Sequence, residues 1–388
     1  MNVPKLRFKE FSDEYKYRNL SDISTLIKDG THGTHENYEN GIPLLSAKDI
    51  NNNKINIPEN CRKISVDDYN KIYKNYLLKK DDILLTIVGS IGRTALYKNE
   101  KVAFQRSVAT IRIDDNNNSN YIRQYIESPM IINQLNNMTN SSAQGGVYLS
   151  SLSKLNFDIP RKEEQLKIAN FLSLLDKKIE LQSKKIEGLK LFKLYMENQF
   201  IFKDDASYIE YKLRDILIEG NKTPVADTSK YQKLTIKLNL KGLEFNESQK
   251  EMSDKRPFYV RDENELIIGK QNYFNGSITI VNKKYAGGIC SNAIMSFKAK
   301  DGFDIKYIYL YLSQKSYMKQ REFLANGTGQ KELSEKEFLN FSIRIPSDNK
   351  VKKIIKNINC ISKKILLEEN KLNKLIELKK GLMQNMFV

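Results

Sequence analysis

The feature that most constrains this sequence is a long helical pattern that occurs twice. Residues 159–202 and 345–388 align without a gap at a shift of 186 residues, which places Ile159-Pro160 on Ile345-Pro346. In each segment the helical pattern begins just after this proline, where a helix readily starts. A repeat of this length constrains the fold, because both copies are expected to form the same structural unit. The chain is therefore expected to consist of two related halves.

Within both copies, apolar residues alternate at spacings of three and four, which predicts a coiled-coil seam. Polar residues interrupt the seam at matching places, Gln182 and Lys193 in the first copy and Glu368 and Lys379 in the second. Matching interruptions favour common ancestry over two unrelated bundle helices that each belong to one domain. The predicted seam consists of Ile168, Leu172, Leu175, Ile179, Ile186, Leu189, Met196, Ile354, Ile358, Ile361, Ile365, Leu372, Leu375 and Leu382.

The segments ahead of the helices share a framework but differ in their interiors. Leu20-Ser-Asp22-Ile23 recurs as Leu213-Arg-Asp215-Ile216, and LSSLSKLNFDIP recurs as LSEKEFLNFSIRIP. Between these markers lie short β-type runs such as DILLTIVGS, VAFQRSVATIRI, ELIIGK, GSITIVNKKY and AIMSFKA, separated by turn residues. The sequence predicts an α+β fold with a pseudo-two-fold internal repeat. Two globular domains, 1–158 and 203–344, alternate with two long helices, 159–202 and 345–388, that pair as an antiparallel coiled coil.

The composition indicates the class of partner. Lys and Arg number 64 against 47 Asp and Glu, a net charge of +17 that is spread along the chain. Such a field favours a polyanion, nucleic acid before an anionic membrane, although a basic composition without any partner is the alternative. No apolar run approaches the ~20 residues that span a bilayer. Three isolated cysteines fit a reducing cytoplasm, so we expect a cytoplasmic nucleic-acid-binding protein.

The predicted helices have a length that suits a DNA ruler. A helix of about 40 residues is roughly 60 Å long, whereas DNA repeats every ~34–36 Å along its axis. The two globular domains are thus expected to sit one to two helical turns of DNA apart. Their differing interiors suit two different half-site sequences.

Three stretches resemble a known family: PRKEEQLKIANFLSLLDKKIE (Pro160–Glu180), DGTHGTHENYENGIPLLSAKDI (Asp29–Ile50) and GSIGRTALY (Gly89–Tyr97). Over essentially its whole length, the chain is similar to the specificity (S) subunit of type I restriction–modification systems, the HsdS family. The resemblance implies two target-recognition domains that bind a bipartite, asymmetric sequence of double-stranded DNA. It also implies docking of two methyltransferase (M) subunits, which restriction (R) subunits then join. S-adenosylmethionine, ATP and Mg²⁺ are then expected in the partner subunits, and no cofactor in this chain.

The sequence offers little chemistry of its own. It contains neither an Asn/Asp-Pro-Pro-aromatic methyltransferase motif nor a G-x-x-x-x-G-K-[ST] phosphate loop. Glu210-Tyr-Lys212, with Asp204 or Asp205 upstream, could mimic a nuclease site, but such tripeptides arise often by chance in a Lys-rich chain. His32 and His35 could begin a metal site, but such a site would need further ligands. We expect a non-catalytic subunit with no metal. The alternatives are a single-chain DNA modification or restriction enzyme with an unrecognised catalytic motif, and a coiled-coil nucleic-acid-binding adaptor.

Candidate DNA contacts follow from the side chains that bond base edges and phosphates. Arg, Lys, Asn and Gln bond purine edges in the major groove, and basic groups bond phosphates. Gln105 and Arg106 stand out because they interrupt an otherwise apolar strand. Each candidate could equally be a solvated surface residue. The candidates are Thr31, His32, Thr34, His35, Lys48, Arg93, Gln105, Arg106, Ser107, Gln144 and Tyr148 in the first domain, and Lys237, Lys255, Arg256, Lys270, Gln271, Asn272, Tyr273 and Asn292 in the second.

Overall fold

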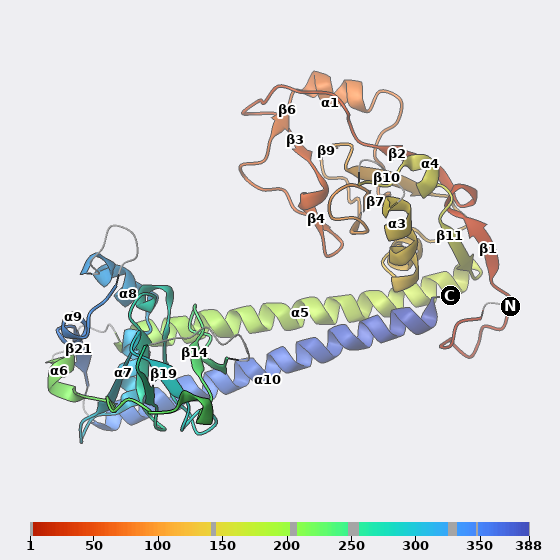
Figure 1. Ribbon diagram of the computed structural model, residues 1–388. Helices are drawn as coiled ribbons and strands as arrows, with labels where there is room; N and C mark the ends of the chain where they lie inside the picture. The colour runs from red at the N-terminus through yellow and green to blue at the C-terminus, as the bar shows by residue number, and fades with distance from the viewer. Residues whose placement is uncertain are drawn as a thin grey trace. The chain divides into compact units, whose positions relative to one another are not determined.

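The computed structural model describes residues 3–140, 145–201, 208–246, 256–324, 332–346 and 348–387. The chain forms two compact units, a first unit of Met1–Lys185 with Glu368–Val388 and a second unit of Ile186–Leu367. Each unit takes a part of both long helices, α5 (Lys162–Ile201) and α10 (Asp348–Met386) (Figure 1). These helices lie inside the ranges predicted for them, and the predicted boundaries of the globular domains stay a prediction.

A four-stranded antiparallel sheet organises the first unit. Its order is β2 (Ser24–Asp29), β10 (Val108–Ile113), β7 (Ile83–Thr86) and β8 (Thr94–Leu96). Apolar side chains of this sheet form one core with α2 (Ser119–Ile126) and α3 (Pro129–Asn140). A separate pair, β1 (Lys16–Asn19) with β11 (Asn156–Ile159), leads into α5.

Smaller elements complete the first unit, most of them between β2 and β7. They are η1 (Leu20–Asp22), β3 (Ile42–Leu45), η2 (Ala47–Asp49), β4 (Ile50–Asn51), β5 (Lys54–Ile55), β6 (Lys63–Ile64), α1 (Val66–Ile72), β9 (Ala103–Phe104) and α4 (Leu149–Leu152). Strand β3 pairs with β6 and β9, and β4 pairs with β5. The run VAFQRSVATIRI, expected as one strand, is β9 and β10 joined by Gln105–Ser107.

The second unit repeats this framework. Its four-stranded sheet has the order β13 (Leu217–Glu219), β20 (Ile294–Ala299), β17 (Leu266–Gly269) and β18 (Ile278–Ile280), all antiparallel. The pair β12 (Ile209–Lys212) with β21 (Ser342–Ile345) leads into α10 as β1 and β11 lead into α5. The sheets and the order of the elements confirm the predicted α+β fold with an internal repeat.

Other elements of the second unit correspond to those of the first or replace them. Helices α7 (Ile305–Leu312) and α8 (Lys315–Arg321) follow β20 as α2 and α3 follow β10, and α9 (Glu335–Leu339) takes the place of α4. The interior differs, as expected from the sequence. It contains α6 (Leu213–Ile216), η3 (Thr228–Lys230), β14 (Leu234–Ile236), β15 (Leu243–Phe245), β16 (Phe258–Val260), η4 (Tyr273–Asn275), β19 (Ile289–Ser291) and η5 (Glu322–Leu324).

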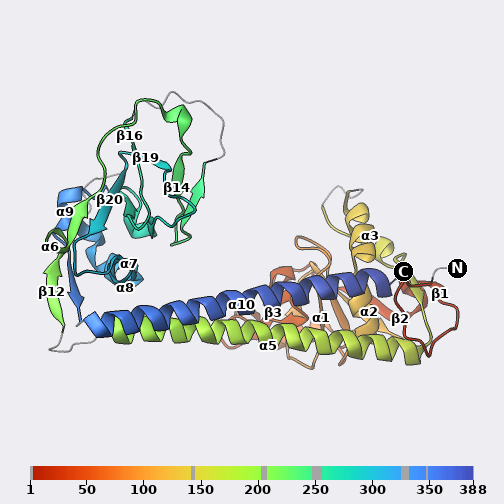
Figure 2. The ribbon, with the colours of Figure 1, turned by 90° about the horizontal axis from the view of Figure 1, so that it is seen from below.

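In the first unit, α5 and α10 pack together and run antiparallel (Figures 1 and 2). Gln182 donates a hydrogen bond from Nε2 to Oε2 of Glu368 (2.7 Å), while Lys379 lies 2.5 Å from the Asp176 carboxylate. Residue numbers thus fall along α10 as they rise along α5. This contact confirms the predicted antiparallel pairing and excludes the alternative of two unrelated bundle helices.

The structure places every predicted seam residue at a buried or half-buried position. The polar interruptions also face inward: Glu368 is 5% exposed and accepts hydrogen bonds from Gln182 and from Lys185 (2.9 Å). These two hydrogen bonds lower the pKa of Glu368 to about 2. Neither Gly188 nor Gly381 ends its helix. Among the described residues, no helix is both long and apolar enough to cross a membrane.

Both helices supply core residues to the units. In the first unit, Ile168 and Leu172 of α5 join Met383, Met386 and Phe387 in the main core. In the second unit, four residues of α10 (Val351, Ile354, Ile355, Ile358) join the core beneath β17 and β20. Burying such side chains stabilises each unit by about 1.5–3 kcal/mol per residue. The helices are therefore part of the folded units as well as connections between them.

Candidate nucleic-acid interface

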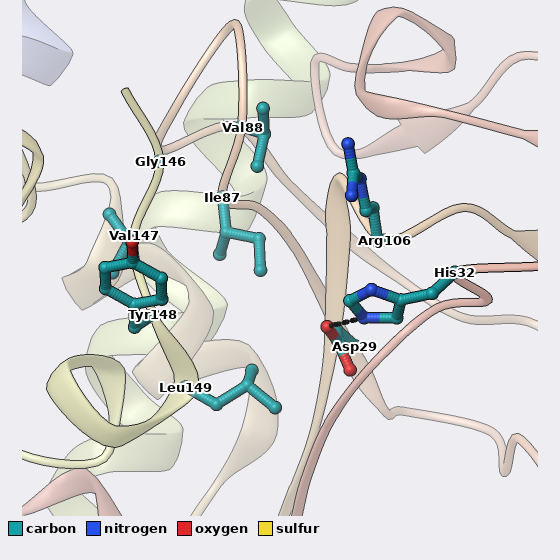
Figure 3. Close-up of a pocket in the computed structure, with 9 residues that line it drawn as sticks. All are labelled: Asp29, His32, Ile87, Val88, Arg106, Gly146, Val147, Tyr148 and Leu149. Atoms are coloured by element: carbon teal, nitrogen blue, oxygen red, sulfur yellow. Dashed lines mark hydrogen bonds and ion pairs between the residues drawn. The ribbon is translucent and has the colours of Figure 1, made fainter. Parts of the chain in front are cut away.

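A pocket of about 480 Å³ opens in the first unit where three strands of its sheet end. Asp29 lies at the end of β2, Ile87 and Val88 follow β7, and Arg106 lies two residues before β10. The remaining wall is the segment Gly146–Leu149, which leads into α4. Figure 3 shows His32 and Arg106 on one side of the pocket and Tyr148 on the other, with Ile87 and Val88 between them. The pocket thus combines an apolar floor with polar groups at its sides.

The backbone around this pocket is fixed by close packing. Gly30 donates a hydrogen bond to the Val108 carbonyl (3.0 Å), and Thr31 donates one to the Phe104 carbonyl (2.8 Å). Any side chain at position 30 would overlap the Phe104 carbonyl, so a glycine is required there. These bonds hold the segment after β2 against the connection between β9 and β10. The positions of His32 and Arg106 are therefore set by the sheet.

The polar side chains of the first pocket differ in their contacts with other residues. The His32 ring lies 2.6 Å from Oδ2 of Asp29, and the ring remains 63% exposed. Tyr148 is 52% exposed at the beginning of α4. Arg106 is exposed, and its guanidinium makes no hydrogen bond or ion pair with any other residue in the described ranges. A free guanidinium beside an aromatic ring and a histidine suits binding of an anion or a base edge.

A second pocket, of about 160 Å³, lies in the second unit. It is lined after β13 by Gly220–Lys222, after β17 by Lys270, and before β20 by Asn292. Glu335, at the beginning of α9, closes one wall. The lining is more polar than that of the first pocket because it holds three cationic side chains, those of Lys222, Arg261 and Lys270.

Ion pairs inside the second pocket occupy its lysines. Glu335 lies 2.7 Å from Nζ of Lys222 and 3.6 Å from Nζ of Lys270. Burial raises the pKa of Glu335, but the hydrogen bond from Lys222 and the charge of Lys270 outweigh burial and hold that pKa below its usual value. Hydrogen bonds to Glu219 and Glu335 raise the pKa of Lys222. Glu335 and Lys222 therefore both remain charged near neutral pH.

A buried arginine supports the wall of the second pocket. Arg261 is 3% exposed, and its guanidinium donates to the carbonyls of Asn221 (3.0 Å) and Ile294 (3.5 Å). It thereby ties the segment after β13 to the first residue of β20. By contrast, Asn292 is exposed, and its side-chain amide has no partner in the part of the chain that the structure describes.

The two pockets occupy the same place in the two repeats. Each lies where the first and third strands of the four-stranded sheet end (β2 and β7, or β13 and β17), where the second strand (β10 or β20) begins, and beside the short helix α4 or α9. The framework that repeats in the sequence thus builds an equivalent pocket twice. The side chains that line the pockets differ.

Three of the first domain's predicted contact residues, His32, Arg106 and Tyr148, come together in its pocket. Several others already have structural partners. His35 lies 2.8 Å from the Thr31 hydroxyl and 3.2 Å from Asp68, and the Ser107 hydroxyl accepts a hydrogen bond from the Ala47 amide (3.0 Å). Outside the pocket lining, Gln105 is half-buried, Thr34, Lys48 and Arg93 are exposed, and Gln144 lies outside the described residues.

Two of the second domain's predicted contact residues, Lys270 and Asn292, line its pocket. Tyr273 requires a correction: it is fully buried, and its hydroxyl donates to the Leu312 carbonyl (2.9 Å), so it cannot meet DNA. The polar loop motif around Tyr273 predicts exposure, but its ring packs in the core of the second unit beside Phe338, which comes from a distant part of the chain. Of the others, Lys237 pairs with Glu244, Asn272 bonds Asn275, Gln271 and Arg256 are exposed, and Lys255 lies outside the described residues.

Sequence reasoning missed several pocket residues. Lys222, Arg261 and Glu335 come from three separate segments and meet only because of the fold. Asp29 opens a motif that the resemblance singled out, yet its partnership with His32 was not anticipated. A charged residue one to three positions beyond the end of a sheet strand, here β13, is the signal that could have identified Lys222.

The patterns considered for catalysis and metal binding can also be placed. Glu210 and Lys212 lie on β12, which pairs with β21, whereas Asp204 and Asp205 lie outside the described residues. His35 reaches Asp68 and His32 reaches Asp29, so the two histidines have different partners. Within the described ranges, no group of three or more His, Cys, Asp and Glu side chains could hold a metal ion.

The fold and its pockets define a duplicated α+β protein with two equivalent sites on a repeated framework. Comparison with known proteins leads to one family. The family described as type I restriction modification DNA specificity domain matches residues 12–191 and again residues 207–378. The chain therefore belongs to the type I restriction–modification specificity subunit family.

Proteins of this family are similar to the chain over nearly its whole length. A putative type I restriction enzyme MjaX specificity subunit from Methanocaldococcus jannaschii is 23% identical over 98% of this chain and 95% of its own. The crystal structure of a type I restriction–modification S subunit from M. genitalium matches with a TM-score of 0.61 and 15% identity, covering 100% of this chain and 99% of that one. A chain from a study of complex assembly and conformational transition of the type I R-M system matches with a TM-score of 0.55, 12% identity, and coverage of 97% and 98%. These similarities show that the fold is shared.

Proposed function

We propose that this chain is the non-catalytic specificity subunit of a type I restriction–modification complex, and that it binds a bipartite, asymmetric sequence of double-stranded DNA. The observation that carries the proposal is the duplicated pocket. Two equivalent sites with different linings, one in each repeat, are what two different half-sites require. Phosphate contacts from the basic surface supply affinity, and the pockets supply sequence discrimination.

The charge of the chain supports a DNA partner. The net charge of +17 is large for 388 residues. Arg106, Lys48 and Arg93 in the first unit are exposed cations that make no ion pair with another described residue. Neutralising phosphates with such groups releases counterions, so the observed affinity should fall steeply as salt rises.

The outer surfaces of the helices support docking of a partner twice. Leu181 and Leu367 are related by the shift of the repeat, and they are 58% and 61% exposed. Phe192 and Leu378 are related in the same way, and they are 50% and 52% exposed. Each unit therefore carries one residue of each pair: Leu181 and Leu378 lie in the first unit, and Phe192 and Leu367 lie in the second. Large apolar side chains exposed at equivalent positions suit two copies of one protein partner.

We take the two partner copies to be methyltransferase (M) subunits, with restriction (R) subunits joining the complex through them. In this arrangement S-adenosylmethionine, ATP and Mg²⁺ act in the partner subunits. The role of this chain is to position those subunits at a chosen sequence. Its own residues bind and orient, and they carry out no bond-breaking step.

Mapping methylated bases tests the proposal. The gene is expressed with its companion methyltransferase gene in a host that lacks both, and the genome is sequenced by a method that detects methylated bases. We expect methylation at one bipartite motif, and none when this chain is omitted. Methylation by the purified chain alone with labelled S-adenosylmethionine would instead favour a single-chain modification enzyme. Motif methylation that persists without this chain would contradict the proposal.

A further inference from the structure

Arg106 and Asn292 occupy the same position in the two repeats. Arg106 lies in the connection between β9 and β10, and Asn292 lies in the connection between β19 and β20. Each stands two residues before a strand residue that pairs with the last residue of the neighbouring strand, Val108 with Thr86 and Ile294 with Gly269. The two positions differ by the same 186 residues that relate Gln182 to Glu368. Topology, register and spacing therefore agree.

The side chains of Arg106 and Asn292 make no polar contact, whereas the charged side chains beside them in the pockets do. Each is exposed, lines its pocket, and makes no hydrogen bond or ion pair with the residues that the structure describes. In the second pocket, by contrast, Lys222 and Lys270 are held by Glu335. In the first pocket, His32 is held by Asp29. Among the charged and amide side chains that line the two pockets, the two without a partner in the described ranges are thus at equivalent positions.

The chemistry of these two side chains is complementary to purines. An arginine guanidinium donates two parallel hydrogen bonds to O6 and N7 of guanine. An asparagine amide bonds N6 and N7 of adenine, which present one donor and one acceptor on the same edge. One structural position can therefore read either purine, according to the side chain that it carries. This matches a framework that is repeated while the bases to be read differ.

We propose that Arg106 and Asn292 are equivalent specificity-determining residues: Arg106 reads a guanine in one half-site, and Asn292 reads an adenine in the other. The inference rests on the proposed function, since it assigns base classes within the DNA target. According to this proposal, one side chain in each pocket determines which base is recognised at one position of the corresponding half-site. In the second pocket, the backbone amide of Lys270 donates a hydrogen bond to the Ala293 carbonyl (3.0 Å), which holds the residue next to Asn292 in place.

Motif selection with exchanged side chains tests the assignment. Wild type, Arg106→Asn and Asn292→Arg are each assembled as the full chain with the companion methyltransferase subunits, and selected against a random-sequence DNA library. Arg106→Asn should replace one guanine by adenine in one half-site, and Asn292→Arg should replace one adenine by guanine in the other. Arg106→Lys, which keeps the charge, should retain guanine with weaker preference. Losing a bidentate contact should lower discrimination at that position by about 5- to 150-fold.

Controls separate the possible failures. Arg18→Ala removes an exposed arginine of β1, outside the pocket, and should leave both half-sites unchanged. A wild-type complex that selects no motif overturns the proposed function and this inference together. A wild-type complex that selects a bipartite motif, with both exchange variants selecting that same motif, overturns the inference alone. Circular dichroism verifies that each variant is folded before selection.

Discussion

Glu368 and Gln182 illustrate how one residue position can serve a repeated fold. They occupy the same place in the two helices, and in the antiparallel pair they meet each other, with Nε2 of Gln182 donating to the Glu368 carboxylate. Lys185 and Lys371 also reach this carboxylate, at 2.9 and 3.3 Å. A single polar layer within an apolar seam fixes the register, because any slip would bury the carboxylate without partners. The matched interruptions in the sequence thus have one physical cause.

The lowered pKa of Glu368 predicts a pH dependence of stability. A carboxyl group whose pKa is lower in the folded state, here about 2 against an ordinary value of 4.5, stabilises the fold fully above about pH 5. That stabilisation is lost as the pH falls from about 5 towards 2. Thermal unfolding should therefore show a difference between wild type and Glu368→Gln that shrinks across this range. A difference that stays constant with pH would contradict this account, and Glu377→Gln, exposed on the same helix, is the matched control.

Phe387, which directly follows the last turn of α10, allows a prediction of how strongly this end of the helix stabilises the first unit. Its ring stacks on Tyr125 at a centroid distance of 4.6 Å, lies 5.5 Å from Tyr121, and is 6% exposed. Replacing it with alanine leaves a cavity in the main core, so Phe387→Ala should lower the free energy of unfolding by about 3–5 kcal/mol in urea denaturation. Gln384→Ala, on an exposed face of the same turn, should change it by less than about 0.5 kcal/mol. Equal effects of the two substitutions would show that Phe387 is not a core residue.

At the scale of elements, the long helices were predictable and the pockets were not. The helices carry a periodic apolar pattern, and the period alone indicates which face is buried. The strands were recognisable from short β-type runs, yet VAFQRSVATIRI divides at Gln105–Ser107 because that segment must turn between two sheets. Pairings such as Lys222 with Glu335 depend on long-range contacts that leave no local signal. Burial of Tyr273 escaped prediction for the same reason.

The length of the helices predicts the spacing of the half-sites. Inserting four residues into one of the long helices, α5 or α10, should lengthen that helix by about 6 Å, since an α-helix rises about 1.5 Å per residue. At about 3.4 Å per base pair, the tolerated gap between half-sites should grow by roughly two base pairs. Motif selection with the inserted variant measures this gap, and Lys177→Ala with Lys178→Ala serves as a control of unchanged length. A gap that does not change would rule out the helices as a ruler.

At the scale of the whole molecule, the repeat explains why framework and specificity can vary separately. The paired strands, the four-stranded sheet and the long helix recur in both halves, while the segments between them differ. The sequence predicted this division because framework residues repeat and interior residues do not. It could not predict which interior side chains reach a pocket, since that depends on the ends of strands brought together by the fold. The family match to residues 12–191 and 207–378 follows the same two halves.

The most direct test of two independent readers on one repeated framework is an exchange of one interior. Residues Glu210–Asn340 are replaced by the corresponding region of a relative with a different motif, and the methylated motif of the assembled complex is then mapped across a genome. The account predicts that one half-site changes to that of the relative, while the other half-site and the gap are retained. A change in both half-sites would contradict it.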